Sequence, residues 1–89
     1  MRIAQHTTKF KQDFKKVVKQ GKDLHKLVNI MEQLVNEENI PQVYKDHTLA
    51  GKWIGCRELH IEPDWLLIYR VLDNIIRFER TGSHSELFK

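Results

Sequence analysis

Three strand-like apolar runs, separated by short turns, make up most of the second half of this 89-residue chain. In residues 53–62 the side chains alternate with a period of two, as in a strand with one apolar and one polar face. The two faces are Arg57, Leu59 and Ile61 on one side, and Cys56, Glu58 and His60 on the other. Residues 65–71 are apolar on both faces, and residues 75–81 form the third run. Because Pro63-Asp64 and Asp73-Asn74 are turn sequences, we expect an antiparallel meander.

The first 35 residues have a helical period instead. The first apolar stripe is Phe10, Phe14, Val17 and Val18. Thr7 or Thr8 supplies a hydroxyl N-cap for this helix, and Gly21 ends it. A second helix follows the N-cap Asp23, with the stripe Leu24, Leu27, Val28, Met31, Leu34 and Val35. Since only Gly21-Lys22 separates the two helices, we expect an antiparallel helix hairpin.

Helices followed by hairpins indicate an α+β fold, in which the helix pair covers one face of a small antiparallel sheet. Ile3 and Ala4 are compatible with a short first strand. Residues 36–42 are expected to form a loop, and residues 44–52 an irregular segment. Ser83 and Glu86 have the spacing of a capping box, which predicts one helical turn at the C-terminus. A chain of this length has room for one domain, residues 1–89.

Composition excludes several classes of protein. The single cysteine, Cys56, excludes an intrachain disulfide and a Cys-x-x-Cys motif, and it is most simply a small packed residue. The strongly apolar run from Trp65 to Tyr69 is far shorter than the roughly 20 residues that span a bilayer, and residues 1–6 lack the apolar part of a signal peptide. We therefore expect a cytoplasmic protein without a membrane partner.

Positive charge is concentrated at the N-terminal end. Residues 1–26 hold eight Lys or Arg but only two Asp. Such a field suits a polyanion, although a solvated, solubilising helix face is an equally good explanation. The candidate RNA-binding lysines of the first helix are Lys9, Lys11, Lys15, Lys16 and Lys19.

Polar groups gather at the ends of the predicted strands. His60 lies near the end of the first run and Asp64 in the turn after it, while Arg80 and His84 lie at and beyond the end of the third. In a meander these positions meet at one rim of the sheet. His47 reaches the same rim if its loop folds back.

These residue types suit RNA strand scission, which needs a base for the 2′-hydroxyl, an acid for the leaving 5′-oxygen and a cation for the phosphorane. Histidine suits proton transfer near neutral pH, and arginine suits the charge. A zinc site is an alternative use of three His and an Asp, but no helical His-x-x-x-His pair is present, so we expect no metal and no cofactor.

Each candidate also has a simpler interpretation. Asp64 is first of all a turn former, and Arg80 can pair with Glu79 or Glu58. Trp53 and Trp65 suit the core, whereas Phe88 near the end of the chain is harder to explain as core. His6 and His25 are expected to be ordinary surface residues.

Four sequence blocks resemble the YafQ branch of the RelE/ParE toxin superfamily. They are Tyr44-Lys-Asp-His47-Thr-Leu, Trp53-x-Gly55-x-Arg57-Glu58-x-His60, Glu62-Pro-Asp64-Trp65-Leu-Leu-Ile-Tyr69, and Arg77-Phe-Glu-Arg80-Thr-Gly82-Ser-His84 with Leu87-Phe88. The blocks cover about half of the chain densely and fall in register up to the C-terminus. The helical N-terminal part matches only in pattern, and Ser83 stands where some relatives carry Thr.

The resemblance implies a toxin of a type II toxin–antitoxin module, an endoribonuclease that cuts messenger RNA in the ribosomal A site. It implies catalysis by the cluster His47, His60, Asp64 and His84, with Trp65, Arg80 and Phe88 holding or orienting the message. It also implies that the basic first helix contacts ribosomal RNA. A DinJ-type antitoxin would mask the site, and the complex would bind operator DNA through the antitoxin.

We assign roles within this cluster as a hypothesis. His84 is the general acid, His60 or Asp64 is the base, His47 stabilises or relays, and Arg80 steadies the phosphorane. Two other classes remain open at the level of sequence: a ParE-like toxin that binds DNA gyrase without catalysis, and a non-catalytic partner-binding module. Neither has a use for the histidine cluster.

Overall fold

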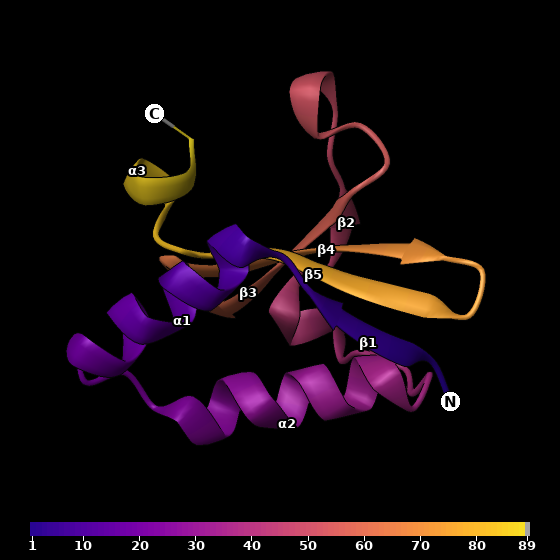
Figure 1. Ribbon diagram of the computed structural model, residues 1–89, viewed down its shortest axis with the longest axis horizontal. Helices are drawn as coiled ribbons and strands as arrows, with labels where there is room; N and C mark the ends of the chain where they lie inside the picture. Colours follow the sequence, from indigo (N-terminus) through magenta and orange to yellow (C-terminus); the bar gives the residue numbers. More distant parts are fainter. Residues whose placement is uncertain (89) are drawn as a thin grey trace.

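The computed structural model describes residues 1–88 as an α+β fold, in which the two long helices cover one face of a five-stranded sheet and a short C-terminal helix lies on the other (Figure 1). The strands are β1 (Ile3–His6), β2 (His47–Thr48), β3 (Arg57–Glu62), β4 (Trp65–Leu72) and β5 (Ile75–Gly82). The α-helices are α1 (Thr8–Lys19), α2 (Leu24–Val35) and α3 (His84–Leu87), and the 3-10 turns are η1 (Gln42–Tyr44) and η2 (Gly51–Trp53). No helix among the described residues is long and apolar enough to cross a membrane.

The strand order is β1-β5-β4-β3-β2. β3, β4 and β5 form the expected antiparallel meander, with turns at Pro63-Asp64 and Asp73-Asn74. The sheet was expected to be antiparallel and is mixed, because β1 pairs in parallel with the first half of β5. The segment expected to be irregular also contains β2, which pairs antiparallel with β3.

Side-chain caps set the ends of the first two helices where the sequence predicts them. The Thr7 hydroxyl accepts a hydrogen bond from Phe10 N at 3.0 Å, and an Asp23 carboxylate oxygen accepts one from His25 N at 3.0 Å. Each cap satisfies a backbone donor that the first helical turn leaves free. Figure 1 shows that α1 and α2 run in roughly opposite directions and splay apart, so they form an open hairpin.

The main core lies between these helices and one face of the sheet. Its buried side chains include Phe10, Leu27, Ile30, Leu59, Trp65, Leu67, Tyr69 and Phe78. Strand alternation supplies this face from β4, since Trp65, Leu67 and Tyr69 all point into it. The apolar stripes predicted for α1 and α2 therefore serve as the cover of the sheet.

A second, smaller core lies on the other face of the sheet. Leu66 and Ile68 of β4 pack there with Cys56 and with Leu87 of α3. Figure 1 shows α3 on the side of the sheet opposite to α2. The capping box predicted for α3 is present: the Ser83 hydroxyl accepts from Glu86 N, and a Glu86 carboxylate oxygen accepts from Ser83 N. Leu87 thus docks α3 against the second face.

A buried ion pair fastens α1 to the end of β5. Asp13 is only 9% exposed, and its two carboxylate oxygens accept hydrogen bonds from Arg80 Nε at 2.6 Å and Nη2 at 3.1 Å. One of these oxygens also accepts from the backbone N of Thr81 at 3.2 Å. β5 has no strand partner from β1 here, because β1 pairs only as far as Phe78. Asp13 therefore accepts the hydrogen bond of a backbone N–H on the part of β5 that β1 does not pair with.

Removing the Asp13 carboxylate is expected to destabilise the fold. The Asp13→Ala variant leaves Arg80 without its partner and Thr81 N without its acceptor, so the free energy of unfolding should fall by about 2–4 kcal/mol. Urea denaturation followed by circular dichroism measures this change. Glu32→Ala, at an exposed position of α2, is the control and should change stability by less than about 0.5 kcal/mol. Equal stability of the two variants would contradict the assigned role of Asp13.

Candidate active site

Two cross-strand rows place most of the predicted site residues on the face of the sheet opposite the main core. The first row is His47 of β2, Glu58 of β3, Ile68 of β4 and Arg80 of β5. The second row is His60 of β3, Leu66 of β4 and Gly82 of β5. Residues paired across a sheet point to the same side. The register of β4 with its neighbours thus aligns side chains that are far apart in the sequence.

A β-bulge in β5 decides which face Arg80 occupies. The pairing with β4 shifts between Ile68 and Tyr69, so that Phe78 pairs with Tyr69 and Arg80 pairs with Ile68. Glu79 is the extra residue. Without the bulge, Arg80 would share the helix-covered face of Phe78, since residues two apart in a strand point the same way.

Two imidazoles flank a buried carboxylate in the first part of the site. Oε1 of Glu58 lies 3.6 Å from Nε2 of His47 and 3.3 Å from Nε2 of His60. The other ring nitrogens face backbone carbonyls: Nδ1 of His47 is 2.7 Å from Lys45 O, and Nδ1 of His60 is 3.3 Å from Pro63 O. A carbonyl oxygen only accepts, so each Nδ1 carries the hydrogen. The Glu58 side chain is 6% exposed, whereas that of His47 is 49% exposed.

A third imidazole lies beside them on the C-terminal tail. His84 donates both its backbone N–H, at 2.9 Å, and its Nδ1–H, at 2.7 Å, to one carboxylate oxygen of Asp64. These hydrogen bonds, the backbone one first, hold the pKa of Asp64 below its usual value. The ring centroids of His60 and His84 are 5.6 Å apart, and those of His47 and His60 are 6.1 Å apart. His47, His60, Asp64 and His84 therefore lie along one rim.

Phe88 and Trp53 extend this rim with aromatic surface. The Phe88 ring centroid is 6.5 Å from that of His84 and 6.3 Å from that of Trp53, which it meets edge-on. Phe88 is 38% exposed. An exposed aromatic ring next to the imidazoles is available for stacking on a base.

Trp65 is placed differently from what the resemblance implies. It is fully buried in the main core, and its Nε1 donates to the Thr81 hydroxyl at 3.0 Å. The simpler interpretation, that Trp65 is a core residue, therefore describes its position, and it has no free face for a base. Thr81 lies three residues before His84. Trp65 therefore helps to fix the end of β5, from which the tail with His84 continues.

Arg80 is committed to Asp13, and neither Glu79 nor Glu58 is its partner. Both oxygens of the Asp13 carboxylate bind the guanidinium, which raises the pKa of Arg80 further above its ordinary value. Asp13 binds Nε and Nη2 of Arg80, so Nη1 is the guanidinium nitrogen that it does not bind. A phosphate contact by Arg80 would therefore use this nitrogen.

The lysines of α1 are all exposed, and one of them ties the helix to the tail. These residues are Lys9, Lys11, Lys15, Lys16 and Lys19. Lys16 Nζ lies 2.9 Å from a Glu86 carboxylate oxygen, and Gln20 donates to the same oxygen at 3.3 Å. The other Glu86 oxygen accepts from Ser83 N at 2.8 Å. Glu86 thus joins α1 to the segment that carries His84.

Protonation of Glu86 is expected to loosen this attachment. The hydrogen bond from Ser83 N and the Lys16 contact lower the pKa of Glu86 to about 2. A lowered folded-state pKa contributes stability that is fully present above the ordinary pKa of 4.5 and is lost as the pH falls towards about 2. The free energy of unfolding of the wild type, from urea denaturation, should therefore fall by about 1–3 kcal/mol more than that of Glu86→Gln over this range. Glu32→Gln is the control and should follow the wild type, and parallel curves for Glu86→Gln and wild type would refute the assignment.

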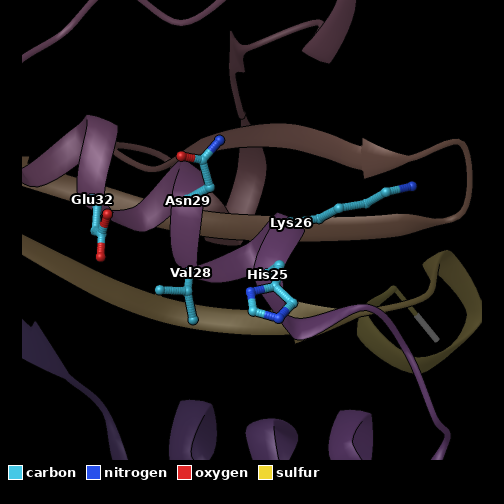
Figure 2. Close-up of a pocket in the computed structure, with 5 residues that line it drawn as sticks. All are labelled: His25, Lys26, Val28, Asn29 and Glu32. Atoms are coloured by element: carbon cyan, nitrogen blue, oxygen red, sulfur yellow. The ribbon is translucent and has the colours of Figure 1, made fainter.

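A hollow on α2 lies away from this chemistry. Figure 2 shows its lining, which is His25, Lys26, Val28, Asn29 and Glu32. All five residues come from the single helix α2, and the hollow is wide open to solvent. It brings together no residues of the histidine rim, so the candidate site is assigned from the side-chain cluster.

Comparison with known proteins identifies the family. The family model for the bacterial YafQ toxin of type II toxin–antitoxin systems matches residues 2–89, and this chain belongs to that family. The mRNA interferase toxin YafQ of Escherichia coli strain K12 is 46% identical over 88 residues, which cover 98% of this chain and 96% of the relative. The suspected resemblance to YafQ is therefore confirmed.

Solved structures agree with the fold. The E. coli DinJ–YafQ complex contains a chain that matches with a TM-score of 0.93 at 44% identity and covers 100% of both chains. A metal-bound toxin from Helicobacter pylori matches with a TM-score of 0.92 at 40% identity, covering 99% of this chain and 100% of that one. The predicted α+β class is confirmed by these matches.

Two acidic residues of the site escaped the sequence reasoning. Glu58 was placed on the polar strand face and named as a possible partner of Arg80, but it was not proposed as a site residue, although it lies two residues before His60 on that face. The two-residue spacing between Glu58 and His60 would have been enough to predict that their side chains lie together. Asp13 gave no signal, because it lies in a lysine-rich helix 67 residues from the arginine that it binds.

Proposed function

We propose that this chain is an mRNA interferase, the toxin of a type II toxin–antitoxin module that cleaves messenger RNA in the ribosomal A site. The observation that carries the proposal is the rim of three imidazoles and two carboxylates, which offers an acid and a base within a few ångströms of each other. The 46% identical E. coli relative is named an mRNA interferase, which supports the same activity here.

His84 is the general acid in this proposal. Asp64 holds Nδ1–H, which leaves Nε2 to donate a proton to the leaving 5′-oxygen. The carboxylate also fixes the orientation of the ring before the transfer. Asp64 thereby becomes the residue that positions the acid, which leaves the base to His60.

His60 accepts the proton of the 2′-hydroxyl, which then attacks the adjacent phosphate. With Nδ1–H on Pro63 O, the neutral ring offers its lone pair at Nε2. Glu58 Oε1, 3.3 Å from that nitrogen, accepts the new N–H after the transfer. His47, on the other side of Glu58, and Nη1 of Arg80 stabilise the negative charge of the phosphorane.

The remaining surface holds the RNA. Phe88 stacks on a base next to the scissile phosphate, while the α1 lysines contact phosphates of ribosomal RNA. This protein works as one domain, residues 1–89, in the cytoplasm. No step of the scheme uses a metal ion or another cofactor.

An antitoxin is the proposed partner that silences the toxin. A YafQ chain from E. coli was solved in complex with DinJ. We infer that a DinJ-like antitoxin binds this chain, masks the histidine rim and carries the complex to operator DNA. Ribosome and message are the other partners.

Loss of any one imidazole should slow cleavage without unfolding the protein. The variants His47→Ala, His60→Ala and His84→Ala should each cut ribosome-bound message about 10²–10⁴-fold more slowly, because each removes one proton-transfer or charge-stabilising group. Primer extension on translating ribosomes measures the rate and the position of the cuts. His25→Ala, on α2 and away from the rim, is the control and should cut at the wild-type rate.

The same experiment separates nuclease from gyrase poison. Full activity in all three variants would remove the nuclease mechanism. If induction changed plasmid supercoiling before it changed any message, the gyrase-binding alternative would replace it.

The lysines of α1 are expected to contribute to the affinity for the ribosome. In Lys11→Gln/Lys15→Gln, the affinity for 70S ribosomes should fall and its dependence on salt should become weaker, by about one unit of log–log slope for each phosphate that the variant no longer binds. Sedimentation with ribosomes over a range of salt concentrations measures both. Lys26→Gln, whose amine pairs with Glu62 on another surface, is the control. An unchanged salt dependence in the double variant would show that α1 does not contact ribosomal phosphates.

A further inference from the structure

Three side chains of the rim have the arrangement of metal ligands. One ligand atom from each of His47, Glu58 and His60 lies within 4.8 Å of the other two. The distances from Glu58 Oε1 to the two Nε2 atoms, 3.6 and 3.3 Å, are close to the ligand–ligand edge of about 3.4 Å in a tetrahedral zinc site with bonds of about 2.1 Å. Only the two imidazoles need to approach each other, so small side-chain rotations complete the set.

The outer hydrogen bonds of both histidines also fit metal ligation. Nδ1–H of His47 is held by Lys45 O and Nδ1–H of His60 by Pro63 O. Histidine ligands commonly donate their second N–H to a carbonyl or carboxylate, which fixes the ring and the tautomer. In both residues this leaves the Nε2 lone pair directed towards Glu58.

Electrostatics favour a cation at this point. With neutral imidazoles, two lone pairs and a carboxylate oxygen converge, and the side chain that carries the carboxylate is only 6% exposed. A buried carboxylate is costly unless a positive charge compensates it. A proton on each ring is one solution, and a divalent metal bound to all three ligands is the other.

We propose that His47, Glu58 and His60 form a site for a divalent transition metal such as Zn²⁺, and that metal bound there switches RNA cleavage off. Three protein ligands leave one coordination position for water. The metal occupies Nε2 of His60 and Nε2 of His47, the atoms that the proposed cleavage uses. The inhibitory half of the proposal rests on the proposed function, whereas the binding half does not.

Binding is tested directly with zinc sulfate. Isothermal titration of untagged, metal-free protein should give one Zn²⁺ per chain, and Glu58→Gln and His60→Ala should each weaken binding by more than about tenfold. Circular dichroism confirms that the variants are folded. His25→Ala is the matched histidine control and Cys56→Ala tests for a thiolate ligand, and both should bind zinc as the wild type does. Wild-type affinity in Glu58→Gln or His60→Ala, or no zinc binding by the wild type, would overturn the site.

Inhibition is tested with protein loaded with zinc and then dialysed, so that free metal does not reach the ribosomes. The loaded wild type should cut message at least about tenfold more slowly than metal-free protein. Loaded protein that is stripped with EDTA and dialysed again before it meets the ribosomes should recover the metal-free rate. His25→Ala should respond in the same way. Unchanged or faster cleavage by the loaded protein overturns the inhibitory role. If zinc binds at the three ligands but the metal-free protein does not cut, the site stands and the proposed nuclease function fails.

Discussion

The hydrogen-bonded register of β4 with its two neighbours is the constraint on which the rest of this structure depends. β4 is apolar on both faces, so a slip by one residue would keep it buried but would send every partner side chain to the wrong face. Trp65, Leu67 and Tyr69 must meet the helices, because α1 and α2 present their apolar stripes there. That requirement leaves Leu66 and Ile68 as the centres of the two rows that hold His60 and Glu58. The core thus positions the site.

The second face of the sheet is stabilised by few residues, and this shapes how the tail is held. α3 packs on a small apolar cluster, to which it contributes Leu87. A four-residue helix has little stability of its own. Polar links to the rest of the chain compensate: Glu86 joins the tail to α1, and Asp64 joins it to the β3–β4 turn. His84 is therefore held mainly by polar contacts, and only Leu87 anchors its helix to an apolar core.

Local patterns in the sequence were enough to predict the helices, their caps, the meander and the tail. Each depends on neighbours within a few residues, as in the Thr7 and Asp23 caps and the Pro63-Asp64 turn. The meander also predicted that His60, Asp64 and His84 would share a rim, since strand connectivity alone brings those positions together. β1 could not be assigned to its parallel place beside β5, because four exposed residues carry no alternation.

What sequence reasoning missed depends on contacts between distant segments. The bulge at Glu79 breaks the alternation that would otherwise place Arg80, and nothing in the local composition marks it. The Asp13–Arg80 pair depends on how α1 crosses the end of β5. For Trp65 the residue pattern indicated the core and the family resemblance indicated the message; the structure places it in the core, where its Nε1 donates to the Thr81 hydroxyl.

The buried carboxylate of Glu58 connects the proposed chemistry with the proposed metal site. Once the proposed base His60 has taken a proton, its new N–H needs an acceptor. Glu58 can be that acceptor, and its burial keeps it aligned with the ring. Shielding an anion between two ring nitrogens, however, creates strong attraction for any cation that fits. A proton and a divalent metal compete for the same lone pairs, and the proton is the one that exchanges readily with solvent after each turnover. An arrangement that favours proton transfer is for this reason also open to inhibition by metal, unless message or antitoxin covers the rim.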